Sequence, residues 1–148
     1  MIRAVIFDFY GVVYTGTAAD PVDRAVVDLV RVLRGTHQVA LCSNISAAGL
    51  GQQVVAHGLR DLFSVMVTSD VAGSAKPDPG IFTYTLERLG VLPSEALFID
   101  DSPRNVAGAE RVGVVGLHYT GVKELRWELE SILDVDLGAS GVVSGVGR

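Results

Sequence analysis

The sequence predicts an α/β protein, a three-layer α/β/α sandwich built on a doubly wound, parallel, five-stranded sheet. Five short runs rich in Val, Ile, Leu and Phe are continuously apolar, as in strands that are covered on both faces. Segments with helical periodicity separate these runs, and strands that alternate with helices form parallel sheets with right-handed crossovers. The predicted strands span residues 4–7, 39–41, 65–67, 96–99 and 114–119.

The predicted helices have recognisable ends. The first begins with Asp20 as N-cap and Pro21 at the first helical position, and it ends at Gly35. Another is opened by Asp78 and Pro79, a combination that also favours a helix start. Glycines follow most of the other helical segments, which span residues 46–57, 79–89, 103–112 and 123–133.

The length fits one domain. The chain has 148 residues, of which 49% are hydrophobic, and a domain of this size can bury about 70% of the surface of its unfolded chain. We expect a single α/β domain over residues 1–137. From Gly138 the residues are small and lack periodicity, which predicts a flexible tail over 138–148.

Charge and cysteine content exclude several classes of protein. The chain carries 12 Lys and Arg against 17 Asp and Glu, a net charge of −5, and contains no run of basic residues. This pattern offers no surface for nucleic acid or anionic lipid. No apolar stretch approaches the roughly 18 residues that cross a bilayer. Cys42 is the single cysteine, so no intramolecular disulfide can form, and we expect a cytoplasmic protein.

Polar residues follow the predicted strands where each strand ends. In doubly wound sheets, ligands bind beyond the carboxyl ends of the strands, where the strand order reverses. The candidate residues are separated by about one strand–helix unit each and should converge on one rim. They are Asp8, Ser43, Asn44, Lys76, Asp100 and Asp101.

These residue types favour phosphoryl transfer. Carboxylates brought together at a sheet edge repel one another unless a cation neutralises them. Oxygen ligands with room for water suit Mg²⁺, which is usually shared with a phosphate. Lys76 and the Ser43 hydroxyl would hold other phosphate oxygens while one carboxylate attacks as nucleophile.

Each residue also has a purely structural interpretation. Asp8 can be a buried carboxylate that caps a turn, and Asp100 and Asp101 can form an N-cap pair ahead of the helix at Pro103. Ser43 and Asn44 are common in turns. Lys76 can be a solvated loop charge, and Asn105 a polar group in the first turn of a helix.

The chain resembles hydrolases of the haloacid dehalogenase superfamily. Four motifs occur in the family's order between Ile2 and about Leu133. VIFDFYGVV resembles the first motif and LCSN the second. KPDPGIF resembles the third and FIDDSPRNVAGAERVG the fourth.

The resemblance implies a role for each motif. Asp8 matches the nucleophile that becomes a phosphoaspartate, Ser43 the phosphate-binding hydroxyl, and Lys76 the lysine that steadies both. Asp101 matches a magnesium ligand and has Asp100 beside it. The family's main-chain carbonyl ligand falls on Tyr10.

Tyr10 is one departure from the phosphatase pattern, because most phosphatase members carry an acid–base Asp at this position. With an unperturbed pKa of about 10, a tyrosine is a poor base at neutral pH. Tyr10 can be a catalytic hydroxyl or an aromatic side chain that packs beside the site. The sequence Asp8-Phe9-Tyr10-Gly11 with Ser43-Asn44 also resembles the dehalogenase branch, which needs no metal and lacks a paired acidic fourth motif.

The other departure is the short connection after the first motif. Only residues 12–19 separate Gly11 from Asp20, whereas capped relatives have tens of residues there. We therefore expect the site to be open to solvent unless a second copy of the chain covers it. We expect the substrate to be a phosphorylated small molecule or macromolecule. The leading hypothesis is a Mg²⁺-dependent phosphomonoesterase. The alternatives are a metal-free 2-haloacid dehalogenase and a catalytically weak phosphate-binding or regulatory module.

Overall fold

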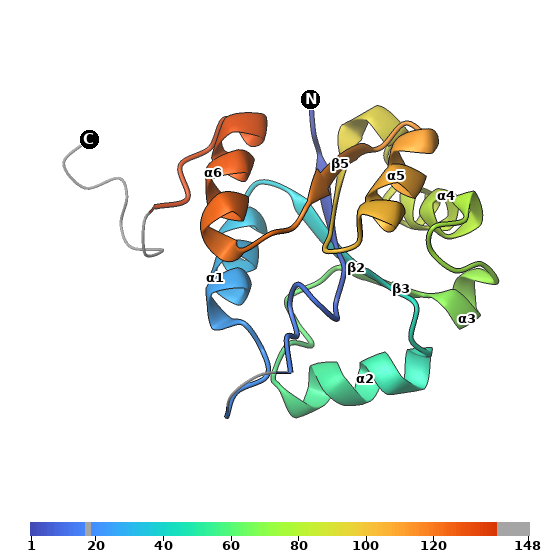
Figure 1. The fold of residues 1–148 in the computed structure, drawn as a ribbon, viewed down its shortest axis with the longest axis horizontal. Coiled ribbons are helices and arrows are strands. Elements are labelled where there is room, and N and C mark those ends of the chain that lie inside the picture. Colours follow the sequence, from blue (N-terminus) through green and yellow to red (C-terminus); the bar gives the residue numbers. More distant parts are fainter. Residues whose placement is uncertain (17–18, 139–148) are drawn as a thin grey trace.

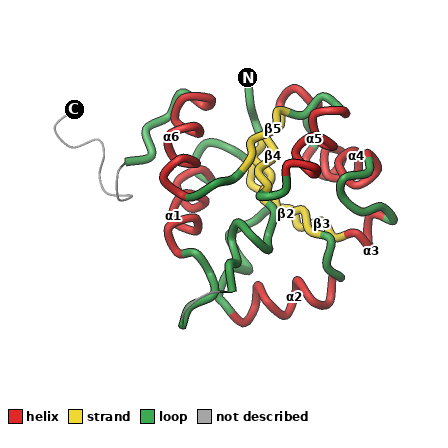
Figure 2. The backbone as a smooth tube through the Cα atoms, viewed as in Figure 1, coloured by secondary structure: helices red, strands yellow, loops and turns green. Residues whose placement is uncertain are grey.

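A computed structural model describes residues 1–16 and 19–138, and it confirms the predicted fold class. The sheet has five strands in the order β3-β2-β1-β4-β5, and every pair of neighbours is parallel. Helices lie on both of its faces (Figures 1 and 2). The strands are β1 (Ala4–Phe7), β2 (Gln38–Ser43), β3 (Val65–Thr68), β4 (Ala96–Asp100) and β5 (Val115–His118). The α-helices are α1 (Arg24–Leu33), α2 (Ala47–Ala56), α3 (Ser69–Ala72), α4 (Pro79–Leu89), α5 (Pro103–Arg111) and α6 (Val122–Leu133).

The three central strands, β1, β2 and β4, bury both faces, as their continuously apolar sequences predict, whereas the edge strands β3 and β5 expose Met66 and Val115. In β1, Val5 and Phe7 point into one core cluster with α1, α2 and α6. Ala4 and Ile6 point into a second cluster with α4 and α5. This alternation follows from the two-residue period of a strand. The polar residues that follow the strands are therefore left at the sheet edge.

The predicted start of the first helix is wrong. Helix α1 begins at Arg24, and Asp23 is its N-cap, accepting hydrogen bonds from the main-chain N–H groups of Ala25 and Val26. Asp20 lies in the turn before it, accepts from the N–H of Val22, and forms an ion pair with Arg24 at 2.8 Å. Both aspartates accept hydrogen bonds from main-chain N–H groups, Asp20 in the turn and Asp23 at the start of the helix. An N-cap aspartate and a turn aspartate have the same sequence signal, so the sequence alone does not tell them apart.

Two short elements were not predicted from the sequence, namely α3 and the 3₁₀ turn η1 (Pro93–Glu95). Both are too short for a periodic pattern to emerge. The predicted tail lies outside the described residues, apart from Gly138 itself. None of the helices in the described parts of the chain has the length and apolar character that a membrane crossing requires.

Helix α5 packs closely against the loop that carries Lys76. A Cβ atom added at Gly108 of α5 would lie 2.5 Å from the carbonyl oxygen of Pro77 and 2.8 Å from its Cβ. Real side chains do not tolerate such distances, so only glycine permits this contact. The contact sets the position of the loop between α3 and α4 relative to the end of β4.

Gly108→Ala tests this contact. We expect the added methyl to lower the free energy of unfolding by about 1–3 kcal/mol, because the backbone of Pro77 must shift. Gly51→Ala is the matched control in α2, where a Cβ meets nothing within 4 Å, and it should raise stability by about 0.5–1 kcal/mol. Urea unfolding of both variants measures the difference; equal effects would contradict the close packing.

Candidate active site

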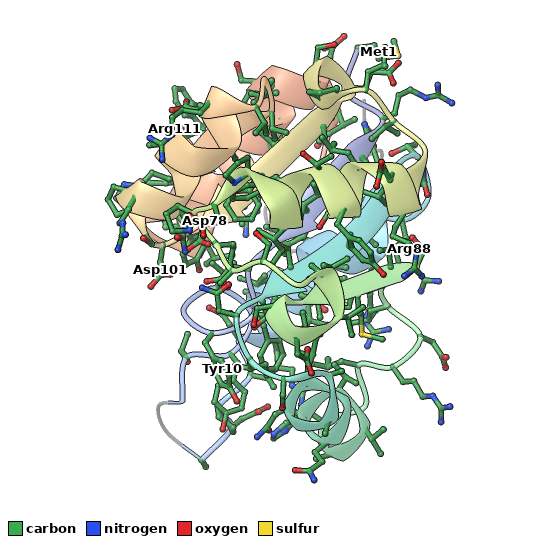
Figure 3. All side chains as sticks on the ribbon, turned by 90° about the vertical axis from the view of Figure 1, so that its right-hand side faces the viewer. Met1, Tyr10, Asp78, Arg88, Asp101 and Arg111 are labelled. Atoms are coloured by element: carbon green, nitrogen blue, oxygen red, sulfur yellow. The ribbon has the colours of Figure 1, made fainter. Side chains whose placement is uncertain are left out.

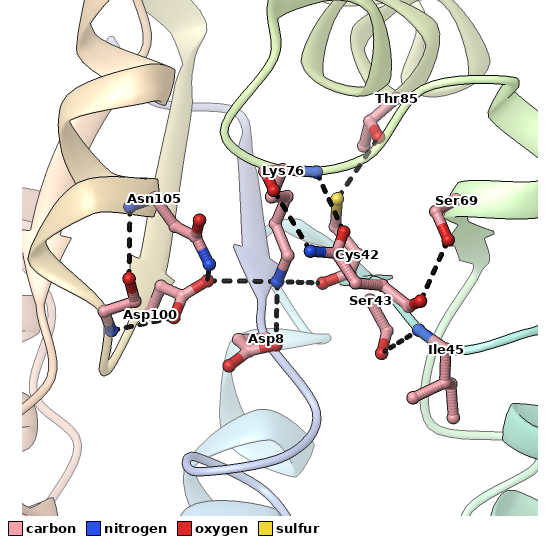
Figure 4. A network of polar contacts seen from close by, with 11 residues as sticks. Asp8, Cys42, Ser43, Ile45, Ser69, Lys76, Thr85, Asp100 and Asn105 are labelled. Atoms are coloured by element: carbon pink, nitrogen blue, oxygen red, sulfur yellow. Dashed lines mark hydrogen bonds and ion pairs between the residues drawn. The ribbon is translucent and has the colours of Figure 1, made fainter.

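The Lys76 side chain lies at the centre of the site and joins the ends of three adjacent strands (Figure 4). Its Nζ donates to Asp8 Oδ1 at 2.8 Å, to the main-chain oxygen of Cys42 at 2.8 Å and to Asp100 Oδ2 at 3.0 Å. An ammonium has three N–H donors, and all three are used. The side chains of Lys76 and Asp100 are only 2% and 1% exposed, so the structure rules out a solvated loop lysine.

Asn44 holds the loop that presents Lys76. Its Oδ1 accepts from the Lys76 main-chain N–H at 2.8 Å, and its Nδ2 donates to the Lys76 carbonyl at 3.1 Å. This reciprocal pair fixes the backbone from which the buried side chain extends. Ser69 Oγ in turn donates to the Asn44 carbonyl at 2.9 Å.

Asp100 is fully buried and is held on both of its oxygens. Its Oδ1 accepts from the Ser102 N–H at 2.9 Å, and its Oδ2 accepts from Asn105 Nδ2 at 3.1 Å as well as from Lys76. Ser102 is the N-cap of α5 and accepts a hydrogen bond from the Asn105 N–H, which sets the position of Asn105 in the first turn of the helix. Asn105 therefore orients the carboxylate of the fourth motif.

Asp101 completes an acidic cluster. One carboxylate oxygen each from Asp8, Asp100 and Asp101 lies within 4.8 Å of the others, a set that can hold a metal ion. Gly11 permits this approach: its φ is 94°, and a Cβ there would collide with the Asp101 carboxylate. The main chain of Asp101 also contacts His118 Nε2 at 3.1 Å.

The charges in this cluster shift its pKa values. Burial raises the pKa of Asp8 to about 7, because it outweighs the opposing charge of Lys76, and the charge of Asp100 acts in the same direction as burial. Burial also raises the pKa of Asp101, and Asp100 adds to the effect. For Lys76 burial alone would lower the pKa, but the charges of its acidic neighbours outweigh burial and raise it. The cluster thus sets three carboxyl groups beside a single ammonium, and their crowding favours the protonated form of Asp8 and Asp101 in the absence of a further cation.

The structure brings Asp8, Lys76, Asp100 and Asp101 together, as the strand-end argument predicts. Ser43 is buried at the end of β2, and its Oγ accepts from the Ile45 N–H at 3.4 Å. The Asn44 side-chain amide forms both of its hydrogen bonds with the Lys76 main chain, so it positions the loop that carries Lys76.

Tyr10 is half-exposed and packs edge-on against the rings of Phe9 and Tyr14. In the described residues no hydrogen bond joins its side chain to the lysine network.

Sequence reasoning missed two members of the site. The Cys42 carbonyl is a main-chain group, and no side-chain pattern reveals it. Gly11 carried a usable signal, because a glycine directly after a strand-end motif indicates positive φ or close backbone approach. Its contact with Asp101, however, depends on how two distant strands pair.

The arrangement can support nucleophilic chemistry at an anionic centre. A carboxylate held by a buried ammonium has a fixed orientation, as an in-line attack requires. The lysine and a metal held by the acidic cluster can together neutralise the oxygens of a phosphoryl group. Three oxygen donors fit a hard cation such as a divalent metal.

Comparisons with known proteins find a phosphatase among the relatives of this chain. A sesquiterpene phosphatase, astK, of Aspergillus oryzae is 32% identical over 112 residues, which are 75% of this chain and 57% of that protein. This chain therefore spans little more than half the length of that relative.

Two solved structures share the fold. A HAD phosphatase from Thermococcus onnurineus superposes with a TM-score of 0.76 at 21% identity, over 86% of this chain and 98% of that one. An L-2-haloacid dehalogenase from Xanthobacter autotrophicus superposes with a TM-score of 0.72 at 19% identity, over 93% of this chain and 86% of that one. Both likenesses show the fold alone.

A family model settles the assignment. The model described as haloacid dehalogenase-like hydrolase matches residues 17–113. This span includes the second, third and fourth motifs and most of the sheet. The chain therefore belongs to the haloacid dehalogenase-like hydrolases.

Proposed function

We propose that this protein is a Mg²⁺-dependent phosphomonoesterase that acts through an aspartyl-phosphate on Asp8. One observation carries the proposal: a single buried ammonium bonds to both Asp8 and Asp100, with Asp101 in the same cluster. A nucleophilic carboxylate, a fixed cation and two further carboxylates beside it are what phosphoryl transfer requires.

Asp8 would attack phosphorus, forming a bond from its carboxylate oxygen while the ester P–O bond breaks. The leaving alkoxide takes a proton from a water at the rim and leaves hydroxide. A second water then attacks the phosphorus of the acyl phosphate and gives its proton to that hydroxide, while the bond between phosphorus and the Asp8 oxygen breaks, which frees inorganic phosphate and restores the carboxylate. Lys76 keeps the nucleophile oriented through its 2.8 Å bond. The buried Ser43 hydroxyl would donate to a phosphate oxygen.

The donor set supports the choice of metal. Asp8, Asp101 and the Tyr10 carbonyl, with Asp100 beside them, are oxygen groups, and such sites suit Mg²⁺. When bound, Mg²⁺ would neutralise charge on the transferring phosphoryl group. The surplus of negative charge in the cluster favours a cation there.

Three further features belong to the proposal. Residues 1–137 would form one unit without a substantial cap, because the connection between Gly11 and α1 is short. The site would thus be open to a phosphorylated small molecule or macromolecule, or be covered by a second copy of the chain.

The free, buried Cys42 is compatible with a reducing compartment such as the cytoplasm. The similarity to the sesquiterpene phosphatase of Aspergillus oryzae also supports phosphatase activity.

Removal of Asp8 or of metal tests the proposal directly. Hydrolysis of 4-nitrophenyl phosphate should require Mg²⁺ and stop with a chelator. Asp8→Asn should retain less than about one-thousandth of the parent rate, because the nucleophile is lost. Asp61→Asn is the control, since this aspartate follows α2 at a distance from the strand-end motifs. Turnover that survives either the chelator or Asp8→Asn would contradict the mechanism.

The same preparation separates the dehalogenase alternative. If Asp8 attacked the carbon of a 2-haloacid, halide would be released in the presence of a chelator. The paired carboxylates Asp100 and Asp101 favour the metal-dependent reaction, because Lys76 alone offsets only part of the repulsion among them and Asp8. We expect no halide release.

The pKa of Asp8 predicts a pH dependence of Mg²⁺ binding. Below its pKa of about 7 the carboxylate carries a proton, which a metal must displace. Apparent affinity should therefore fall by up to about tenfold per pH unit below that value and level off above it. Calorimetric titrations between about pH 6 and pH 8 measure this. Asp8→Asn should bind more weakly and lose the part of the pH dependence centred near pH 7, and a parent profile without that part would contradict the shift.

Tyr10→Asp tests whether the missing acid–base group limits the rate. A carboxylate there can protonate the leaving group and then activate water, contributions of about 10²- to 10⁴-fold in other enzymes. We expect a faster kcat for Tyr10→Asp than for Tyr10→Asn, which has nearly the same shape but no ionisable proton. If the parent binds phosphate without turnover and Tyr10→Asp acquires turnover, the parent is a regulatory module. Equal rates for the two variants would show that Tyr10 does not limit the chemistry.

A further inference from the structure

A cluster of aromatic rings follows the proposed nucleophile. Tyr10 and Tyr14 lie with ring centroids 5.1 Å apart at 85°, and Tyr14 and His57 lie 5.7 Å apart at 66°. Tyr10 is 39% exposed, and Tyr14 and His57 are partly exposed. We call these three side chains the aromatic ledge. It joins the turn after β1 to the C-terminal end of α2.

The aromatic ledge lies beside the acidic cluster. Tyr10 is two residues after Asp8, a distance of at most about 7 Å between Cα atoms. The next residue, Gly11, is in contact with the Asp101 carboxylate. Figure 3 shows Tyr10 and Asp101 along the same side of the molecule, with Arg88 on the other side. Tyr10 thus lies in the same strand-end turn as Asp8, where the organic group of a phosphate ester bound at Asp8 would leave the site.

The turn that carries the rings is tightly held. The Phe9 carbonyl accepts from the Tyr14 N–H at 2.9 Å, and the Tyr14 carbonyl accepts from the Gly11 N–H at 2.8 Å. Phe9 is fully buried under the ledge, and its ring lies 5.0 Å from Tyr10 and 5.4 Å from Tyr14. Such ring pairs contribute beyond the area that they bury. The ledge is therefore a preorganised aromatic surface.

We infer that the aromatic ledge binds the organic group of the substrate, and that this group is an aromatic ring. The inference rests on the proposed phosphomonoesterase function. The phosphate would occupy the buried, charged end of the site at Lys76, so the ester group extends outward to the rim. The ledge consists of three aromatic side chains with exposed area and contains no carboxylate or ammonium group, and aromatic rings pair favourably with another flat ring.

Binding of stable phosphonates tests the inference without turnover. In the presence of Mg²⁺, phenylphosphonate should bind about three- to tenfold more tightly than methylphosphonate, a ratio typical of one added ring contact. Tyr14→Ala should reduce this ratio toward one and leave methylphosphonate affinity unchanged. Tyr14→Phe, which keeps the ring, should retain the ratio. Calorimetry measures all three, and kcat/KM for benzyl phosphate against glycerol phosphate should follow the same order.

The outcomes separate the two proposals. If methylphosphonate and inorganic phosphate bind but phenylphosphonate binds no more tightly than methylphosphonate, the phosphate site is supported and the aromatic ledge does not bind substrate. A parent that prefers glycerol phosphate to benzyl phosphate also overturns the inference. If no phosphonate or phosphate binds, the proposed function fails, and the inference fails with it. The ratio in the parent needs no variant, so a misfolded Tyr14→Ala would leave the test intact.

Discussion

One buried ammonium is the interaction on which the rest of this site depends. Lys76 bonds to groups at the ends of β1, β2 and β4, which are neighbours at the centre of the sheet. Two aspartates could not be buried there alone, because an unpaired buried charge costs several kcal/mol, about 3–5 when one partner of a pair is removed. The lysine of the proposed chemistry is therefore also the group that allows Asp8 and Asp100 to be buried at the carboxyl ends of the strands.

The balance of charge in the site remains uneven. One ammonium faces two carboxylates directly, and Asp101 adds a third to the cluster. Ionising Asp8 here costs free energy, because the carboxylate is buried and lies beside other carboxylates. The raised pKa of Asp8 is the result. A group that brings positive charge relieves the cost, so ligand binding and the stability of this end of the sheet are linked.

Much of the fold and site could be predicted because the rules involved are local or topological. Apolar runs located the strands, and the crossover rule placed Asp8, Lys76 and the Asp100–Asp101 pair at one edge. The start of α1 was misplaced because Asp20 and Asp23 offer competing caps and only packing decides between them.

Other parts of the site were beyond sequence reasoning. The Cys42 carbonyl has no side-chain signature, and it enters the site only because of the strand order. The contact of Gly11 with Asp101 and that of Tyr14 with His57 join segments that are distant in the sequence. Their geometry depends on how the turn after β1 folds against β4 and α2.

The absence of a side chain at Gly108 has a consequence for how such a site can evolve. Asp100 and Asp101 precede α5 and Lys76 precedes α4, so the close contact of Gly108 with Pro77 ties the position of these two carboxylates to that of the lysine. A substitution that shifts either side of this contact displaces the other. Selection for a new substrate is thereby directed away from the charged centre and toward side chains such as Tyr10 and Tyr14, which form no bond to Lys76 in the described residues.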